Sequence, residues 1–283
     1  MSPVIGAIIG DIVGSKFEFN NWKGKDFPFF HSACRFTDDS VMTIAIGTAL
    51  LESQADPSRL RDLIVPIMQK IGLAYPYCGY GGSFRKWLKE SVPQPYNSYG
   101  NGAPMRVSAC GIVGKSLDEV KTLSRIVTQV SHNHPEALKT AEAVAGCVFL
   151  ARSGMDKQVI YDFVRQSYYP LEFTLDAIRA EYDFDVSSQG STPQALVAFF
   201  ESRNFEDAIR NAVSIGGDTD TIAAISGSIA GEYYGIPAEM IPKAHFYLDR
   251  YLSNLVSAFT AVYPCKIAET SDVSDTPIRW NQP

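Results

Sequence analysis

The feature that most constrains this chain is the segment 216–221, which reads Gly-Gly-Asp-Thr-Asp-Thr and precedes an apolar run at 222–230. It holds two carboxylates and two hydroxyls within four residues, and such hard oxygen atoms are the ligands that Mg²⁺, Mn²⁺ and Ca²⁺ prefer. Residues two apart do not share a helix face, so Asp218 and Asp220 can converge only where the backbone turns into a helix. The paired glycines permit that turn. We therefore expect an acidic helix N-terminus here.

A second oxygen-rich cluster lies far upstream, directly before another apolar run at 41–51. Its members are Thr37, Asp38, Asp39 and Ser40. One interpretation is that both clusters only cap helices, with Thr37 in one and Asp218 or Thr219 in the other as N-caps. Two clusters, however, supply more carboxylate than capping needs, and converging carboxylates repel one another without a cation. A shared metal site is the better interpretation.

Length and composition predict one large domain. The chain has 283 residues, of which 46% are hydrophobic, and this is enough to bury a sizeable core. We expect a single domain over residues 1–265, a polar tail over 266–283, and a monomer. A net charge of −6 argues against broad electrostatic binding of nucleic acid.

The cysteines and the N-terminal segment indicate a cytoplasmic protein. Five cysteines are scattered without a Cys-x-x-Cys pair, so neither a zinc site nor a disulfide framework is expected. The apolar run 4–13 is too short to span a membrane, and glycines and Asp11 interrupt it. It predicts a short buried helix that presents Asp11 and, after a bend at Gly14, Glu18.

Helical periodicity recurs along most of the chain, whereas strand alternation is scarce. The fold class we predict is all-α, a compact globule of about ten or more helices. Residues 20–36 are expected to be irregular and to cover the mouth of the site, and residues 75–105 to form a long functional loop. The expected helices are 4–13, 37–53, 58–72, 117–130, 137–152, 156–168, 171–182, 192–201, 204–215 and 222–234, with two more in 237–261.

Within the long loop, the glycine-rich strings at 79–83 and 98–102 expose backbone N–H groups that can hold phosphate oxygens. Their tyrosines can stack on a base or a ribose. His132 and His134 follow in a short polar link between two expected helices. A structural or solvated role is the default for an isolated histidine such as His134.

Five segments together resemble the ADP-ribosylglycohydrolase family. They occur in the order found in that family and span residues 10–221. The segments are Gly-Asp-Ile-Val-Gly at 10–14 with Glu18-Phe19 behind it, Phe-Thr-Asp-Asp-Ser at 36–40, Ser-Tyr-Gly-Asn-Gly-Ala-Pro-Met-Arg at 98–106, Ser-His-Asn-His-Pro-Glu-Ala at 131–137, and the string at 216–221.

The resemblance implies two Mg²⁺ or Mn²⁺ ions and a site for ADP-ribose. The implied metal ligands are Thr37, Asp38, Asp39, Asp218, Asp220 and Thr221. The implied ADP-ribose contacts are Ser98, Tyr99, Gly100, Asn101, Gly102, Met105 and His132. Glu18 is our candidate for the acid/base, Asp39 is a further catalytic candidate, and Asp11 is expected to orient the ligands. The adjacent Asp38 and Asp39 are expected to contact separate ions, or one ion and one water.

The resemblance also implies the reaction. We expect a metal-dependent hydrolase that cleaves the N- or O-glycosidic bond between ADP-ribose and a modified target, with ADP-ribosyl-arginine on protein as the first candidate and ADP-ribose as product. Alternatives are ADP-ribosyl-serine, an ADP-ribosylated nucleobase, a small ADP-ribose ester, and a non-catalytic ADP-ribose-binding protein. An aspartate-nucleophile phosphatase is disfavoured, because in those enzymes the Asp-x-Asp motif ends a strand near the start of the domain.

Overall fold

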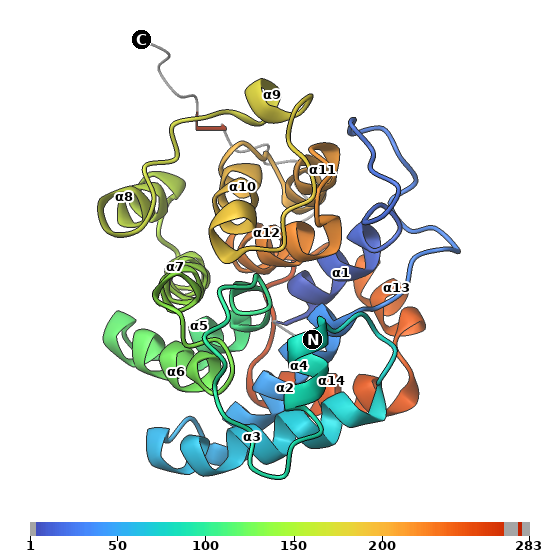
Figure 1. Cartoon of the computed structure of the whole chain (residues 1–283). Helices are drawn as coiled ribbons and strands as arrows, with labels where there is room; N and C mark the ends of the chain where they lie inside the picture. The colour runs from blue at the N-terminus through green and yellow to red at the C-terminus, as the bar shows by residue number, and fades with distance from the viewer. Residues whose placement is uncertain (1–3, 269–276, 279–283) are drawn as a thin grey trace.

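A computed structural model describes residues 4–268 and 277–278, and it is all-α as predicted. Within these residues there are fourteen α-helices, one short 3₁₀-helix and no strand, with only two isolated β-bridges. Figure 1 shows the helices wrapped around α12. Their bounds are α1 Ile5–Gly14, α2 Asp38–Ser53, α3 Pro57–Ala74, α4 Gly82–Trp87, η1 Pro104–Arg106, α5 Ser108–Val113, α6 Leu117–Gln129, α7 Pro135–Arg152, α8 Lys157–Ser167, α9 Leu175–Ile178, α10 Ser188–Phe200, α11 Phe205–Ser214, α12 Thr219–Tyr234, α13 Met240–Tyr247 and α14 Arg250–Val262.

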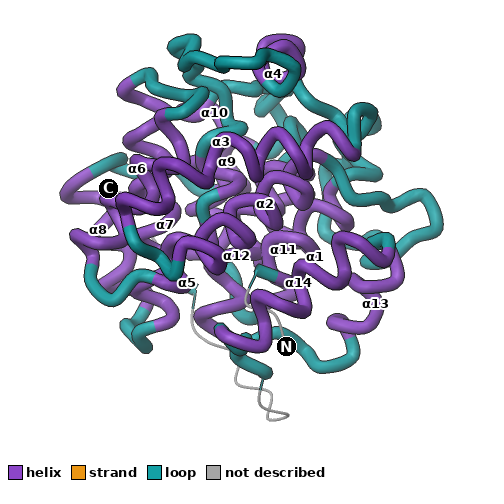
Figure 2. Tube along the Cα trace, turned by 90° about the horizontal axis from the view of Figure 1, so that it is seen from below, coloured by secondary structure: helices purple, strands orange, loops and turns teal. Residues whose placement is uncertain are grey.

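The centre of the molecule is the pair α1 and α12, which lie close together in Figures 1 and 2. A glycine stripe on α1 makes this approach possible. A Cβ added to Gly6 would lie 2.4 Å from the carbonyl oxygen of Gly227, one on Gly10 would lie 2.0 Å from that of Ala223, and one on Gly14 would lie 2.3 Å from that of Thr219. Because the α1 numbers rise as the α12 numbers fall, the helices are antiparallel.

This antiparallel contact brings together the two helix ends that lie next to acidic residues. The last turn of α1 lies beside the first turn of α12, since Thr219 donates its hydroxyl to the Gly14 carbonyl at 2.8 Å. The chain that leaves α1 therefore carries Glu18 past Asp218 and Asp220. Packing of glycine backbones, rather than an apolar stripe alone, sets the position of the site.

Several helices begin after a residue whose side chain caps the N-terminus, as predicted for Thr37. Thr37 accepts a hydrogen bond from the backbone N–H of Asp39 at the start of α2, and Ser116 does the same for α6. Asp56 and Asn204 cap α3 and α11 in the same way. A side-chain oxygen at each of these N-termini satisfies an N–H group that has no partner inside the helix.

The helix predicted over residues 171–182 is wrong. Only the single turn α9 forms there, because Leu171 follows a proline and has a φ of 52°. Thr174 then caps a new start by accepting from the N–H of Ala177. The residues after α9 form an irregular loop, 179–187, which contributes to the candidate site described below.

The glycine-rich stretch 75–105 is also less irregular than we predicted. It contains α4, and η1 starts at its end. Tyr80, Phe84 and Trp87 on and before α4 are buried, and the Phe84 and Trp87 rings stack with centroids 5.3 Å apart. This aromatic packing supports a helical turn that a reading of the glycines alone does not predict.

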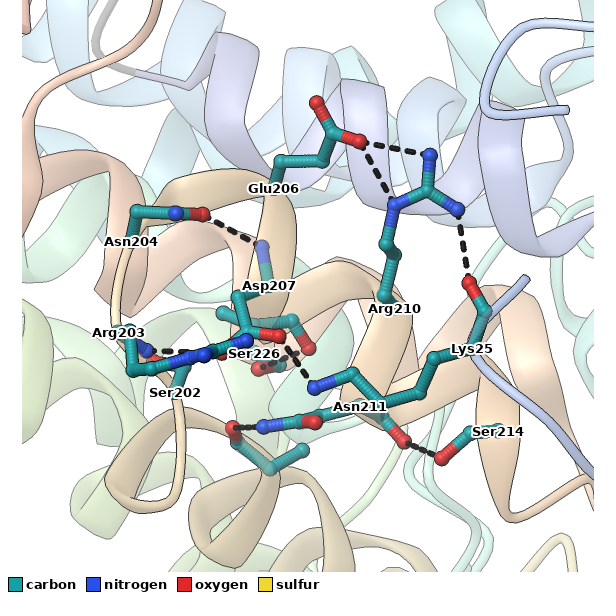
Figure 3. Close-up of polar contacts among 12 residues, drawn as sticks. Lys25, Ser202, Arg203, Asn204, Glu206, Asp207, Arg210, Asn211, Ser214 and Ser226 are labelled. Atoms are coloured by element: carbon teal, nitrogen blue, oxygen red, sulfur yellow. Dashed lines mark hydrogen bonds and ion pairs between the residues drawn. The ribbon is translucent and has the colours of Figure 1, made fainter. Parts of the chain in front are cut away.

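Residues 20–36 form no helix, as expected, and polar contacts fix them to α11 (Figure 3). Lys25 forms an ion pair with the buried Asp207, and Arg210 donates to the carbonyl oxygens of Lys25 and Phe27 at 2.9 and 2.8 Å. The Arg210 guanidinium also lies over the Phe27 ring, 4.8 Å from its centroid. The segment is thus anchored although it has no regular structure.

The predicted tail over 266–283 lies largely outside the described residues. Its first part makes contacts that the sequence did not predict. Ile236 donates to the carbonyl of Lys266, and Ala268 donates to that of Ile236. Across the described parts of the chain, no helix is both long and apolar enough to cross a membrane.

Candidate metal centre and ligand loop

Two groups of carboxylates come together where α1, α2 and α12 meet. In each group, one oxygen atom from every member lies within 4.8 Å of those of the other members. Asp220 at the start of α12 belongs to both groups. The first group is Glu18, Asp218 and Asp220, and the second is Asp11, Asp39 and Asp220.

Asp11 holds the start of α2 in place. One of its carboxylate oxygens accepts from the Thr37 hydroxyl at 2.7 Å, and the other accepts from the backbone N–H of Thr37 at 2.9 Å and of Ser40 at 3.1 Å. The Ser40 hydroxyl also donates to Asp11. These bonds fit the orienting role that we predicted for Asp11. Its place in the second carboxylate group also puts it within reach of an ion.

Asp39 faces Thr221 across the gap between α2 and α12. The Thr221 hydroxyl lies 3.3 Å from Oδ2 of Asp39, and the Thr37 hydroxyl lies 3.5 Å from the same oxygen. The other oxygen, Oδ1 of Asp39, is buried and has no hydrogen-bond partner among the described residues. A buried carboxylate oxygen without a donor is expensive, and a divalent cation would satisfy it.

Asp218 begins α12 but does not cap it, because its side chain accepts no hydrogen bond from the helix backbone. It accepts instead from the Asn101 amide, at 2.7 Å. Asn101 in turn donates to the Ser191 hydroxyl at 3.0 Å. The predicted ligand loop and the predicted metal site therefore touch at Asn101 and Asp218.

Asp38 is placed differently from the other predicted metal ligands. It belongs to neither of the two carboxylate groups found among the described residues. Its Oδ1 faces Gly79, where an added Cβ would lie 2.6 Å away, and its backbone N–H donates to the Cys78 carbonyl at 2.9 Å. Gly79 has a φ of 124°, a conformation that favours glycine.

The electrostatics of the centre are dominated by burial and by like charge. Burial, followed by the Asp220 carboxylate, raises the pKa of Glu18 to about 8. The same two causes raise the pKa values of Asp38 and Asp39 well above the usual range. None of these carboxylates forms an ion pair with a lysine or arginine in the described part of the chain. The protein itself therefore supplies little compensation for their charge.

The donor set fits a hard divalent cation. It consists of carboxylates and the hydroxyls of Thr37 and Thr221, without a histidine or cysteine in either group. Oxygen-only ligands suit Mg²⁺, Mn²⁺ or Ca²⁺ rather than zinc or copper. The partnerless Oδ1 of Asp39 agrees with this fit.

The predicted ligand loop is held by the loop at 179–187. The N–H of Asn101 donates to the Val186 carbonyl at 2.8 Å, and the N–H of Ser188 donates to the Tyr99 carbonyl at 2.8 Å. Ser98 accepts from the N–H of Gly100 at 3.1 Å. Tyr99 is 53% exposed, so its ring is accessible at the surface.

Met105 and His132 lie below this loop and are both buried. The Met105 sulfur is 4.0 Å from the hydroxyl of Thr221, one of the predicted metal ligands. His132 lies against Gly102, where an added Cβ would be 3.1 Å from Nε2. Their roles in holding ADP-ribose remain predictions.

Several residues at the site were missed by the sequence analysis. Asn21 accepts from the N–H of Gly217, and Lys23 donates to the carbonyls of Tyr182 and Ile215. These contacts fasten the segment 20–36 to the glycine turn before α12. The two asparagines at positions 20 and 21 were a signal for a turn, but nothing in the sequence indicates their distant partner.

Comparison with known proteins identifies the family of this chain. A sequence model of the ADP-ribosylglycohydrolase family matches residues 3–265. The chain is 27% identical over 269 residues to ADP-ribosylarginine hydrolase Tri1 from Pseudomonas putida, covering 85% of this chain and 72% of that protein. It is 24% identical over 318 residues to ADP-ribosylhydrolase ARH3 from Mus musculus, covering 84% of each.

The fold has a solved counterpart. A structure described as an ADP-ribosylglycohydrolase-related protein complex matches with a TM-score of 0.65 at 22% identity, covering 93% of this chain and 96% of that one. The family match spans nearly the whole chain and includes all the residues of both carboxylate groups. The chain therefore belongs to the ADP-ribosylglycohydrolase family of enzymes.

Proposed function

We propose that this protein is a metal-dependent hydrolase that releases ADP-ribose from a modified target. The first candidate substrate is ADP-ribosyl-arginine on protein. The observation that carries the proposal is the pair of carboxylate groups that share Asp220 beside the half-buried Glu18. The arginine linkage is supported by the similarity to ADP-ribosylarginine hydrolase Tri1.

The two carboxylate groups would hold two Mg²⁺ or Mn²⁺ ions. Thr37, Asp39, Asp220 and Thr221, together with Asp218 and Asp38, are the ligands we propose. Asp11 adds its carboxylate to the second group. Paired divalent ions can orient sugar hydroxyls and stabilise charge that develops in the transition state.

Glu18 is the residue that we propose moves the proton. Cleavage at the anomeric carbon passes through an oxocarbenium-like state, so the leaving group needs an acid and the water needs a base. A pKa of about 8 keeps Glu18 protonated near neutral pH in the metal-free protein, and a bound cation would lower that value. A carboxyl group with a pKa in this range can both donate and accept a proton.

The ligand loop would hold the ADP part of the substrate. Backbone N–H groups around Gly100 and Gly102 suit phosphate oxygens, and the exposed Tyr99 ring offers a stacking surface. Asn101 is fixed by Asp218 and Ser191 on either side. It therefore couples the position of this loop to the metal ligands.

The proposal is tested by measuring free ADP-ribose released from arginine- and serine-ADP-ribosylated proteins, with Mg²⁺ or Mn²⁺ and with EDTA. We expect metal-dependent release from the arginine-linked protein. Release from the serine-linked protein alone would change the assigned linkage. The absence of release from both, with intact ADP-ribose binding, would contradict the hydrolase assignment for these linkages, and the absence of binding as well would contradict the whole proposal.

A further inference from the structure

Arg106 is a buried cation whose position the proposed chemistry does not explain. Its side chain is 1% exposed and has no ion pair with a carboxylate in the described part of the chain. Its guanidinium donates to the Ser131 hydroxyl at 2.8 Å and lies over the Phe84 ring, 5.5 Å from the centroid. Burying a charge is expensive unless hydrogen bonds compensate it. The hydrogen bond to Ser131 therefore helps to offset the cost of burying the Arg106 charge.

Ser131 connects Arg106 to His132. The Ser131 oxygen lies 2.8 Å from Nδ1 of His132 and is completely buried. A guanidinium can only donate, so the Ser131 oxygen must be the acceptor in its bond with Arg106. The single hydroxyl hydrogen of Ser131 remains available, and Nδ1 is the one acceptor found for it among the described residues.

This count of donors decides which nitrogen of His132 carries hydrogen. If Nδ1 carried it, the buried Ser131 hydroxyl would have no acceptor for its own hydrogen, which costs free energy. With Nδ1 unprotonated, the Ser131 oxygen accepts from Arg106 and the Ser131 hydrogen is donated to Nδ1, so both the acceptor and the donor of this hydroxyl are satisfied. A neutral imidazole then carries its hydrogen on Nε2.

Nε2 of His132 faces the ligand loop. It lies 3.1 Å from the position of a Cβ on Gly102 and 3.7 Å from that of a Cβ on Gly100. Glycine at position 102 leaves room for the imidazole edge, whereas a Cβ at position 100 would make an ordinary van der Waals contact with it. The ring is further held beside Tyr96 and Phe84, with centroids 5.7 and 6.1 Å from its own.

The surroundings also keep this imidazole neutral. Burial, followed by the nearby Arg106 guanidinium, lowers the pKa of His132 well below 6.5. The charged group that faces the ring is thus a cation, and it disfavours a second positive charge on the ring. His132 is therefore a fixed neutral donor rather than a proton shuttle.

We infer that Arg106 is a positioning residue that acts through Ser131 to hold His132 as the Nε2–H tautomer, with its N–H directed at the loop 98–102. The ligand that accepts this hydrogen bond, a phosphate or ribose oxygen of ADP-ribose, rests on the proposed function. The tautomer does not rest on it, because it follows from the contacts within the protein.

The tautomer can be measured in the Mg²⁺-loaded full-length protein by ¹H–¹⁵N NMR of the imidazole rings. The chain has four histidines, so His132 is assigned from a His132→Gln variant. We expect Nδ1 at the shift of an unprotonated ring nitrogen and Nε2 at that of a protonated one, near neutral pH. The reverse assignment, or a charged ring, would overturn the inference.

Variants then test whether Arg106 and Ser131 set this state. Ser131→Ala should mix the two tautomers, whereas Ser131→Thr, which keeps the hydroxyl, should retain Nε2–H. Ser124→Ala is the matched control, because Ser124 is also a completely buried serine but has no hydrogen-bond partner among the described residues. A Ser131→Ala spectrum with the wild-type tautomer would contradict the inference. Arg106→Lys, which keeps the charge and a donor, should preserve the tautomer at least in part.

Binding of ADP-ribose provides the second readout. Ser131→Ala should weaken it by about fivefold, the loss expected for one hydrogen bond, and Ser124→Ala should not. Equal affinity of Ser131→Ala and the wild type would overturn the directing role of His132. Failure of the wild type to bind ADP-ribose would instead count against the proposed function, and the NMR result would still decide the tautomer.

Discussion

The molecule contains two buried charged regions of opposite sign, and the free-energy cost of burying charge is offset differently in each. The acidic centre, formed by the two carboxylate groups around Asp220, has no lysine or arginine paired with it among the described residues. In the basic region, as far as the structure describes the chain, Arg106 pairs with no carboxylate and instead contacts neutral partners, which are the Ser131 hydroxyl, the Val127 carbonyl and the Phe84 ring. A guanidinium can be satisfied by neutral acceptors and an aromatic face.

The clustered carboxylates have no comparable set of compensating partners among the described residues. Burial and neighbouring carboxylates raise the pKa values of Asp39 and Asp220, and Oδ1 of Asp39 has no donor in the described part of the chain. The comparison teaches that neutral neighbours can hold a buried guanidinium, even though its Nε has no hydrogen-bond partner where the structure describes the chain, whereas the acidic centre needs protons or cations from outside. The following predictions test that difference.

The largest effect is expected from Asp220→Asn, which removes the carboxylate common to both groups. We expect affinity for Mn²⁺ to fall by at least about 100-fold, and hydrolysis with it. Asp26→Asn changes the same charge at an exposed position and serves as the control. Calorimetric titration of both variants provides the measurement. Wild-type affinity in Asp220→Asn would show that the two groups do not form the metal site.

Glu18→Gln separates the acid/base role from ligand binding. The amide keeps the size of the side chain but cannot donate a carboxylic proton, so turnover should fall by about 100-fold or more. Binding of ADP-ribose should change little. Turnover is followed as released ADP-ribose and binding by calorimetry. Turnover equal to that of the wild type would remove Glu18 from the mechanism.

Gly10→Ala tests whether the close approach of α1 and α12 builds the acidic centre. The added Cβ would lie 2.0 Å from the Ala223 carbonyl oxygen, so the helices must separate. We expect a loss of about 1–3 kcal/mol in the free energy of unfolding, with weaker Mn²⁺ binding. Gly82→Ala is the control, because nothing lies within 4 Å of its added Cβ. Denaturant unfolding with unchanged stability in Gly10→Ala would contradict the packing that we describe.

The smallest effect is expected from a change of pH on the stability of the protein after treatment with EDTA. Burial raises the pKa of Glu18 from 4.5 to about 8 and also raises that of Asp220. A raised carboxyl pKa in the folded state means that the folded state binds more protons than the unfolded chain. The associated stability is present below about pH 4.5 and is lost as the pH rises through about 8.

The melting temperature of the metal-free protein should therefore fall by several degrees between about pH 6 and pH 9, and saturating Mg²⁺ should reduce this fall. Calorimetry in matched buffers gives both curves. A melting temperature that rises with pH in EDTA would show that these carboxylates are not held in the way that the structure indicates.

The sequence predicted the parts of this centre that depend on local chemistry. Thr37 caps α2, and Asp218 and Asp220 stand at the start of α12, because capping preferences and glycine turns act over a few residues. The all-α fold followed from periodicity in the same way. The antiparallel contact of α1 and α12 was only partly visible, as small residues at helical spacing.

The rest depends on contacts between distant segments. The packing of α1 against α2 places Asp11 together with Asp39 and Asp220. The same packing leaves Asp38 facing Gly79. Residues 179–182 of the loop at 179–187 were predicted as helix, and the contact of Val186 with Asn101 could not be foreseen. Local propensity does not determine such pairings, because tertiary packing overrides it.

The most direct test of the account is the number of Mn²⁺ ions that the metal-free protein binds, measured by calorimetric titration and repeated with Arg106→Lys. We predict about two ions per chain in both proteins, because the acidic centre needs cations and the basic region does not take part. No binding to the wild type, or sites that disappear with Arg106→Lys while the fold persists, would contradict it.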